Sequence, residues 1–241
     1  MKEKLYTIPV NDAFHEDCEC PVCSMYRSIE QDALRFTMSG YMVEERRAES
    51  DKVGFCEKHL RSLYAGEDRL GLAWMVKTHM DHIIEEIEGR QSETVKAASF
   101  FKKKAEPSGL AQYMDYLGHS CYVCDKINAM FERYLVTIFY LYKKEVDFRK
   151  VYGESKGFCT EHYRMLYEMA PTQLGGELLQ SFIKDTNRLY LENMKRVRDD
   201  VSWFISKFDY RFKDEPWKNA QDSIPRAMIK LNGILPPENK K

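Results

Sequence analysis

The chain has 241 residues, of which 37 are Lys or Arg and 38 are Asp or Glu, so its formal net charge is -1 at pH 7. A hydrophobic share of 44%, with only 8 Pro and 12 Gly, is typical of a folded globular protein and argues against disordered, collagen-like and loop-rich β classes. The near-zero net charge disfavours a nucleic-acid partner and a polybasic membrane-binding role. No apolar run approaches the ~20 residues that span a bilayer, and the first residues lack a signal peptide's apolar core, so we expect a cytoplasmic protein.

The first half of the chain is predicted to be helical. A long helix runs from Ser24 to about Glu49, with Ser39-Gly40 as a candidate kink. A short helix opens at Cys56, and a second long helix follows at roughly 70–90. The segment 97–109 is rich in Lys and ends in Pro and Gly, which predicts a linker.

The second half repeats this order of helices. Residues 125–152 contain neither Gly nor Pro, and their apolar side chains recur at helical spacing, which predicts one continuous helix. The β-branched centre at 136–138 leaves a strand as the alternative. A short helix opens at Cys159, a long one covers roughly 174–212, and a short helix with Pro225 near its first turn precedes a frayed tail. In the helix predicted over 125–152, the side chains expected to be buried are those of Ile127, Met130, Phe131, Tyr134, Leu135, Ile138, Tyr142 and Val146.

An internal repeat relates the two halves. The sequence CPVC at 20–23 recurs as CYVC at 121–124, and GFCEKH at 54–59 recurs as GFCTEH at 157–162. We therefore divide the chain into a first repeat at 1–96, a linker at 97–109, a second repeat at 110–213 and a C-terminal extension at 214–241. The predicted fold is an all-α helical bundle of two pseudo-symmetric repeats, which two metal sites hold together.

The repeated motifs carry metal-ligand chemistry. Two cysteines separated by two residues can direct both sulfurs at one ion, and a Cys and a His at i, i+3 share one face of a helix. Cysteines at helix N-termini have lowered thiol pKa values, which favours the thiolate that a metal needs. Three thiolates and one imidazole form a CCCH set that closes a tetrahedral zinc site. The eight candidate ligands are Cys20, Cys23, Cys56, His59, Cys121, Cys124, Cys159 and His162.

Geometry favours sites that combine the two copies. A helix over 125–152 would span about 42 Å, whereas the loop at 153–158 can return only about 24 Å. The CxxC and GFCxxH motifs of one copy should therefore lie at opposite ends of the long helix. Pairing within a copy remains an alternative if the helices fold back, which Ser39-Gly40 would permit in the first copy. The expected sites are Cys20, Cys23, Cys159 and His162, and Cys121, Cys124, Cys56 and His59.

Weaker candidates flank these motifs. Cys18, His15 and His119 precede the CxxC pairs and could replace a ligand, although a spare surface role is favoured. A second His/carboxylate set lies on the predicted helix at 70–90, where a solvated polar face is favoured: His79, His82, Glu85 and Glu86.

The chain resembles a domain-of-unknown-function family of uncharacterised bacterial proteins, chiefly from Firmicutes. The resemblance covers most of the chain and is carried by the two CxxC and two GFCxxH motifs together with FDYRFKDEPW at 208–217. It implies a bacterial cytoplasmic metal-site protein. We expect two zinc ions and a binding or interaction module for a protein or small-molecule partner. The alternative is an iron–sulfur or other metal-dependent redox protein or enzyme, and the sequence does not decide whether the chain catalyses a reaction.

Overall fold

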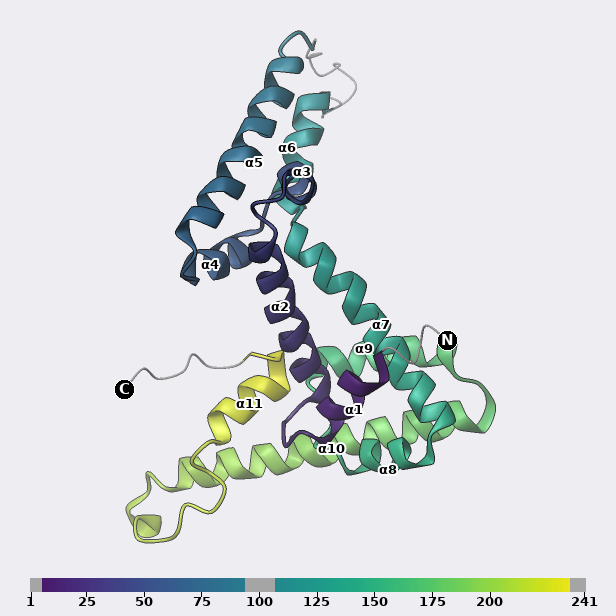
Figure 1. The fold of residues 1–241 in the computed structure, drawn as a ribbon. Coiled ribbons are helices and arrows are strands. Elements are labelled where there is room, and N and C mark those ends of the chain that lie inside the picture. The colour runs from purple at the N-terminus through teal and green to yellow at the C-terminus, as the bar shows by residue number, and fades with distance from the viewer. Residues whose placement is uncertain (1–5, 94–106, 235–241) are drawn as a thin grey trace, which may run out of the picture. The chain divides into compact units, whose positions relative to one another are not determined.

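The computed structural model describes residues 6–93 and 107–234 (Figure 1). Within these ranges the chain forms 11 α-helices and no β-strand, which confirms the predicted all-α class. A short 3-10 helix, η2 (Tyr210–Phe212), precedes the last α-helix. The α-helices are α1 (Thr7–His15), α2 (Pro21–Ser39), α3 (Glu44–Val53), α4 (Glu57–Ala65), α5 (Arg69–Gly89), α6 (Gly109–His119), α7 (Tyr122–Lys144), α8 (Val146–Glu154), α9 (Thr160–Gln173), α10 (Gly176–Ser206) and α11 (Ser223–Asn232).

The chain forms two compact units. Unit 1 consists of Met1–Ser28 and Phe131–Lys241, and unit 2 consists of Ile29–Met130. The boundaries between the units fall inside α2 and α7, so each unit contains segments from both halves of the sequence. The sequence repeats at 1–96 and 110–213 stay a prediction, and most of the predicted linker, 97–106, lies outside the described residues. None of the described helices has the length and apolar character needed to cross a membrane.

The continuous helix predicted over 125–152 is wrong. The chain leaves the helical conformation at Glu145, with φ -118° and ψ 115°, and α8 begins at the next residue. This change of direction brings Phe148 and Tyr152 against Phe14 of α1, with ring centroids 5.1 and 5.6 Å apart. Val146, which the helical pattern assigned to the buried stripe, is 70% exposed. Aromatic burial outweighs the local preference for a longer helix, and periodicity alone does not reveal this.

Other boundaries agree more closely with the sequence. The candidate kink at Ser39-Gly40 is a complete break between α2 and α3, and residues 136–138 are helical, so the strand alternative is wrong. α10 ends at Ser206, before the predicted end at 212. α11 contains Pro225 in its first turn, as predicted. The sequence did not predict α1 and α6, the helices that precede the two CxxC motifs.

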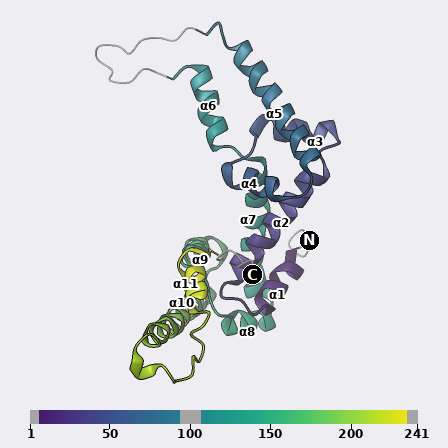
Figure 2. The ribbon, with the colours of Figure 1, turned by 90° about the vertical axis from the view of Figure 1, so that its left-hand side faces the viewer.

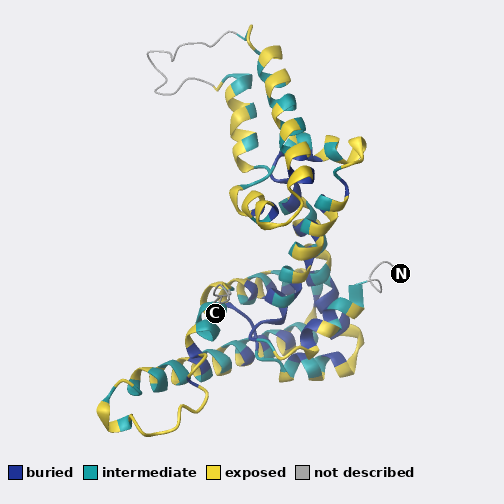
Figure 3. Ribbon diagram, turned by 60° about the vertical axis from the view of Figure 1, so that its left-hand side comes forward, coloured by how far each residue is buried: buried dark blue, intermediate teal, exposed yellow. Residues whose placement is uncertain are grey.

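Unit 1 has an aromatic core. Tyr142 donates a hydrogen bond to Asp185 at 2.7 Å, and the hydroxyls of Tyr152 and Thr186 are 2.7 Å apart. These bonds satisfy polar groups that would otherwise be buried without partners. Buried residues appear dark blue in Figure 3. The largest fully buried aromatic side chains are Tyr142, Tyr152, Phe139, Phe148, Phe158 and Phe182.

The C-terminal helix belongs to this unit. α11 packs against α9 and α10, and Figures 1 and 2 show the three helices together. Arg226 of α11 forms a 2.7 Å ion pair with Asp200 of α10. The Thr160 hydroxyl at the start of α9 donates to the Lys230 carbonyl at 3.2 Å. These contacts fix the end of α11 beside the cysteine-bearing start of α9.

Candidate metal centres

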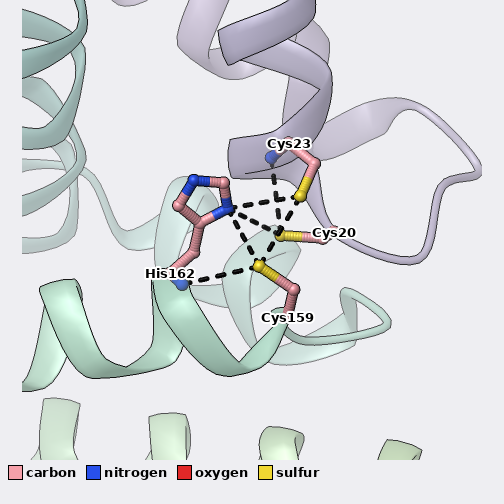
Figure 4. Close-up of side chains that lie close together, drawn as sticks. All are labelled: Cys20, Cys23, Cys159 and His162. Atoms are coloured by element: carbon pink, nitrogen blue, oxygen red, sulfur yellow. Dashed lines mark hydrogen bonds between the residues drawn. The ribbon is translucent and has the colours of Figure 1, made fainter. Parts of the chain in front are cut away.

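The structure brings the eight predicted ligands together in two clusters. Each cluster has four candidate ligand atoms that all lie within 4.8 Å of one another. The grouping across the two sequence copies is confirmed, and the alternative of pairing within a copy is wrong. Cluster A lies in unit 1 and consists of Cys20, Cys23, Cys159 and His162 (Figure 4). Cluster B lies in unit 2 and consists of Cys56, His59, Cys121 and Cys124.

Helix N-termini position the ligands of both clusters. In cluster A, Cys20 directly precedes α2 and Cys159 is the N-cap of α9. The backbone N–H of Cys23 donates to Cys20 Sγ at 3.4 Å, and that of His162 donates to Cys159 Sγ at 3.5 Å. In cluster B, Cys121 directly precedes α7, where the Cys124 N–H donates to Cys121 Sγ at 3.5 Å, and Cys56 is the N-cap of α4. The positive end of the helix dipole and these N–H groups both favour thiolates.

The Gly-Phe-Cys segment sets the chain direction before the third cysteine. Gly54 and Gly157 have φ values of 65° and 74°, which glycine adopts readily and other residues rarely do. A Cβ at Gly157 would lie 2.9 Å from the carbonyl oxygen of Leu189, so this position also needs glycine for close approach. Phe158 is 0% exposed and anchors the loop in the core. In the second copy the motif thus combines a turn, a buried anchor and a candidate ligand, whereas Phe55 in the first copy is only partly buried.

The interatomic distances fit a single tetrahedral ion. Tetrahedral zinc with ordinary bond lengths places sulfur and nitrogen about 3.6 Å apart and two sulfurs about 3.8 Å apart. In cluster A, His162 Nδ1 lies 3.2, 3.3 and 3.5 Å from the three sulfurs. In cluster B, His59 Nδ1 lies 3.3, 3.3 and 3.4 Å from the sulfurs. In cluster A the sulfurs of Cys23 and Cys159 are 3.6 Å apart, and in cluster B those of Cys56 and Cys124 are 3.8 Å apart.

The three thiols of cluster A lie close together and differ in pKa, because two of them donate hydrogen bonds to the third. Cys159 has a pKa below the ordinary thiol range, because its sulfur accepts hydrogen bonds from Cys20 and Cys23. Burial raises the pKa of Cys20, and the hydrogen bond that Cys23 donates to Cys159 raises the pKa of Cys23 to about 12. The cluster therefore favours one thiolate and two protonated thiols. A divalent cation would displace the two remaining protons and use all three sulfurs.

Cluster B differs in its surroundings. Burial raises the pKa of Cys124 to about 12. Burial also opposes ionisation of Cys56, but the His59 backbone hydrogen bond and its neighbouring thiols lower its pKa overall. His59 Nε2 lies 3.1 Å from the Glu30 carboxylate, which also pairs with Lys58 at 2.6 Å. A carboxylate on the far nitrogen of a metal-binding imidazole fixes its orientation and strengthens it as a ligand.

The corresponding position in cluster A is apolar. Phe131 contacts the His162 ring, with ring centroids 5.5 Å apart. Phe131 follows Cys124 by seven residues along α7, as Glu30 follows Cys23 along α2. The sequence analysis placed Phe131 in the buried stripe but did not connect it with His162, and it did not single out Glu30. A spacing of seven from the CxxC cysteine returns to the same face of a helix and could have identified both roles.

A buried ionic group lies beside cluster A. Lys230 of α11 is 1% exposed, donates to the Glu19 carbonyl at 2.6 Å and lies 3.3 Å from the Glu19 carboxylate. Arg196 also pairs with Glu19, at 2.5 Å. Burial lowers the pKa of Lys230, whereas Glu19 and Cys20 favour its charged form. Three thiolates on a divalent cation leave a net negative charge. Lys230 and Arg196 together carry one positive charge more than Glu19 neutralises, and this positive charge offsets the negative charge of the site. No sequence signal indicated these residues.

The weaker candidates lie outside both clusters, and the described residues contain no further group with metal-ligand spacing. His15 and His119 contact backbone carbonyls of their own helices at 2.8 Å. Burial raises the pKa of Cys18 to about 11, so it is a weak nucleophile. His79 contacts the Asp51 carbonyl at 2.6 Å and packs over the glycine of the first GFC segment. The polar set that includes His82, Glu85 and Glu86 is not assembled into a metal site.

The fold and the two clusters define an all-α protein with two CCCH sets of metal-ligand geometry. Residues 1–238 match the Family of unknown function (DUF6062), and the chain belongs to this family. The predicted resemblance to a domain-of-unknown-function family is therefore confirmed. No curated protein and no solved structure matches the chain.

Proposed function

We propose that the chain is a cytoplasmic zinc protein that holds one ion in each cluster and acts as a binding module. The observation that carries the proposal is the pair of CCCH sets with the edge lengths of a tetrahedral site. Four protein ligands complete the coordination of zinc, which favours a structural role. Metal binding would then contribute to the stability of each unit, because it joins segments that are distant in sequence.

The distances favour one ion per cluster over an iron–sulfur cluster. Cysteines that hold a multinuclear cluster bind different iron atoms, so their sulfurs are spread around it. Here the sulfurs of Cys23 and Cys159 are 3.6 Å apart and those of Cys56 and Cys124 are 3.8 Å apart, which suits ligands of the same ion. A single thiolate-bound iron has similar dimensions, so metal identity needs a direct measurement.

Elemental analysis tests the proposal. We expect two zinc ions per chain, and no visible absorption, in protein purified anaerobically without added metal. The double variant Cys56→Ser/Cys124→Ser should retain one zinc, and Cys18→Ser should retain both as the matched control. Iron with absorption near ~400 nm would instead support the redox alternative. Protein that binds neither metal, even after reconstitution, would refute the proposal.

An apolar groove supports the interaction role. Within unit 2, a groove of about 650 Å³ is lined by Leu60 and Tyr64 of α4 and by Leu72 and Val76 of α5. Tyr64 is 64% exposed, so the groove can contact a protein partner that presents apolar side chains. Affinity capture with the native chain and Tyr64→Asp tests this role. The exposed Tyr210→Asp, outside the groove, is the control. A partner lost only with Tyr64→Asp supports it, and equal capture refutes it.

A further inference from the structure

The two clusters differ in solvent access. In cluster A all three cysteines are buried, with Cys20 1%, Cys23 4% and Cys159 1% exposed. In cluster B, Cys56 and Cys124 are partly exposed. The other two ligands of cluster B, Cys121 and His59, are 2% and 1% exposed. Cluster B therefore has two protected and two accessible ligands.

The C-terminal helix accounts for the protection of cluster A. Cys23 and Cys159, the sequence counterparts of Cys124 and Cys56, both face Gly233 at the end of α11. A Cβ on Gly233 would lie 3.2 Å from Cys23 Sγ and 3.7 Å from Cys159 Sγ. The backbone thus covers the two sulfurs whose counterparts in cluster B remain partly open.

The protected ligands of cluster B are also held firmly. His59 is oriented by Glu30 through its Nε2, at 3.1 Å. Cys121 Sγ accepts the backbone N–H of Cys124 at 3.5 Å. An ion in cluster B would therefore keep two anchored ligands while an accessible thiolate left. Affinity and exchange rate are separate properties here, because the rate depends on access for an entering ligand.

We propose that cluster B is a metal-exchange site for thiol ligands, whereas cluster A releases its ion slowly and without help from an entering thiol. This inference rests on the proposed metal binding. An entering thiolate forms a sulfur–metal bond as the bond to Cys56 or Cys124 breaks, and the departing cysteine takes up the proton that the entering thiol released. No electrons are transferred. The exchanging molecule is a small thiol or a cysteine-bearing protein, since both present the same sulfur.

Release kinetics of the zinc-loaded full chain test the exchange. The protein carries Cys18→Ser, which removes the one cysteine outside the two clusters. It is mixed with a chromogenic zinc chelator and increasing concentrations of mercaptoethanol. We expect one zinc equivalent to leave at least about tenfold faster than the other, a difference of about 1.4 kcal/mol in barrier height. The fast rate should rise with thiol concentration and the slow rate should not. Two equal release rates, or two rates that do not depend on thiol concentration, would overturn the inference.

Site assignment uses the same protein. Brief alkylation of the zinc-loaded chain, read by peptide mass spectrometry, should modify Cys56 and Cys124 before Cys23 and Cys159. The opposite order, or equal modification, would overturn the inference. A chain ending at Ala220 lacks α11 and should gain a second fast, thiol-dependent phase if it retains helical content. The alkylation order in the full chain decides the matter if the shortened chain does not fold.

The source of the thiol is distinguished by adding a cysteine-rich zinc-free peptide in place of mercaptoethanol. Faster exchange with the peptide at equal thiol concentration would indicate a protein source, and equal rates would indicate a small thiol. Failure of this proposal is separable from failure of the proposed function. A chain with two zinc ions that leave equally slowly refutes only the exchange site. A chain that binds no metal refutes the proposed function itself.

Discussion

Gly157→Ala should destabilise unit 1 more than an ordinary glycine substitution. Gly157 has a φ of 74°, and a Cβ there would lie 2.9 Å from the Leu189 carbonyl oxygen. That carbonyl belongs to the interior of α10 and also accepts a 3.0 Å hydrogen bond from Asn193. The backbone of α10 therefore cannot yield without distorting a helix, and the substitution affects the segment that presents Cys159.

Gly176→Ala is the matched control, because Gly176 has a φ of 58° and the added Cβ would meet no atom within 4 Å beyond its chain neighbours and the backbone of its own helix. Placing alanine in the left-handed region costs about 1–2 kcal/mol at either site. The contact with α10 adds about 1–3 kcal/mol at Gly157, the usual range for overpacking. We expect free energies of unfolding to fall by about 1–2 kcal/mol for Gly176→Ala and about 2–5 kcal/mol for Gly157→Ala.

Urea unfolding followed by circular dichroism measures both effects, with zinc content determined on the same samples. The difference between the variants isolates the contact with Leu189. If the two free energies of unfolding agreed within about 0.5 kcal/mol, the usual scatter between unrelated sites, the close approach would be unimportant and the reasoning refuted. A lower zinc content in Gly157→Ala alone would show that the turn also positions the ligand.

Three further predictions concern the surroundings of the ligands. Glu30→Gln should weaken zinc binding by cluster B about 10–100-fold, because His59 loses its charged partner; competition titration measures this, and an unchanged affinity would contradict it. Zinc affinity of cluster A should rise with pH, since the raised pKa of Cys23, about 12, keeps its thiol protonated until the metal displaces the proton. A pH indicator should detect the release of protons when zinc binds. Zinc binding without proton release would contradict the predicted rise of affinity with pH. Lys230→Met should lower the free energy of unfolding by about 2–4 kcal/mol, because Glu19 loses a buried partner. Urea unfolding measures this change, and a decrease below about 1 kcal/mol would show that the contact between Lys230 and Glu19 contributes little to stability.

Sequence reasoning succeeded where chemistry depends on spacing. The intervals between Cys20 and Cys23, and between Cys159 and His162, identified candidate ligands that the structure groups in one cluster. The length of the intervening helix also predicted pairing across the copies. That conclusion survives the break at Glu145, because α7 alone has 23 residues and separates the two motifs of the second copy. The break itself escaped prediction, since apolar spacing continues through it.

The sequence by itself determined the helical class, the eight candidate ligands and the way they group. These follow from local rules: i, i+3 positions share a helix face, and glycine permits the turn before the third cysteine. Only the tertiary structure decided which ligands are covered. Gly233 and Lys230 reach cluster A from more than sixty residues beyond its last ligand. Whether a distant segment excludes water from a sulfur depends on packing between helices, which no local pattern encodes, and that packing is what makes two equivalent motifs chemically different.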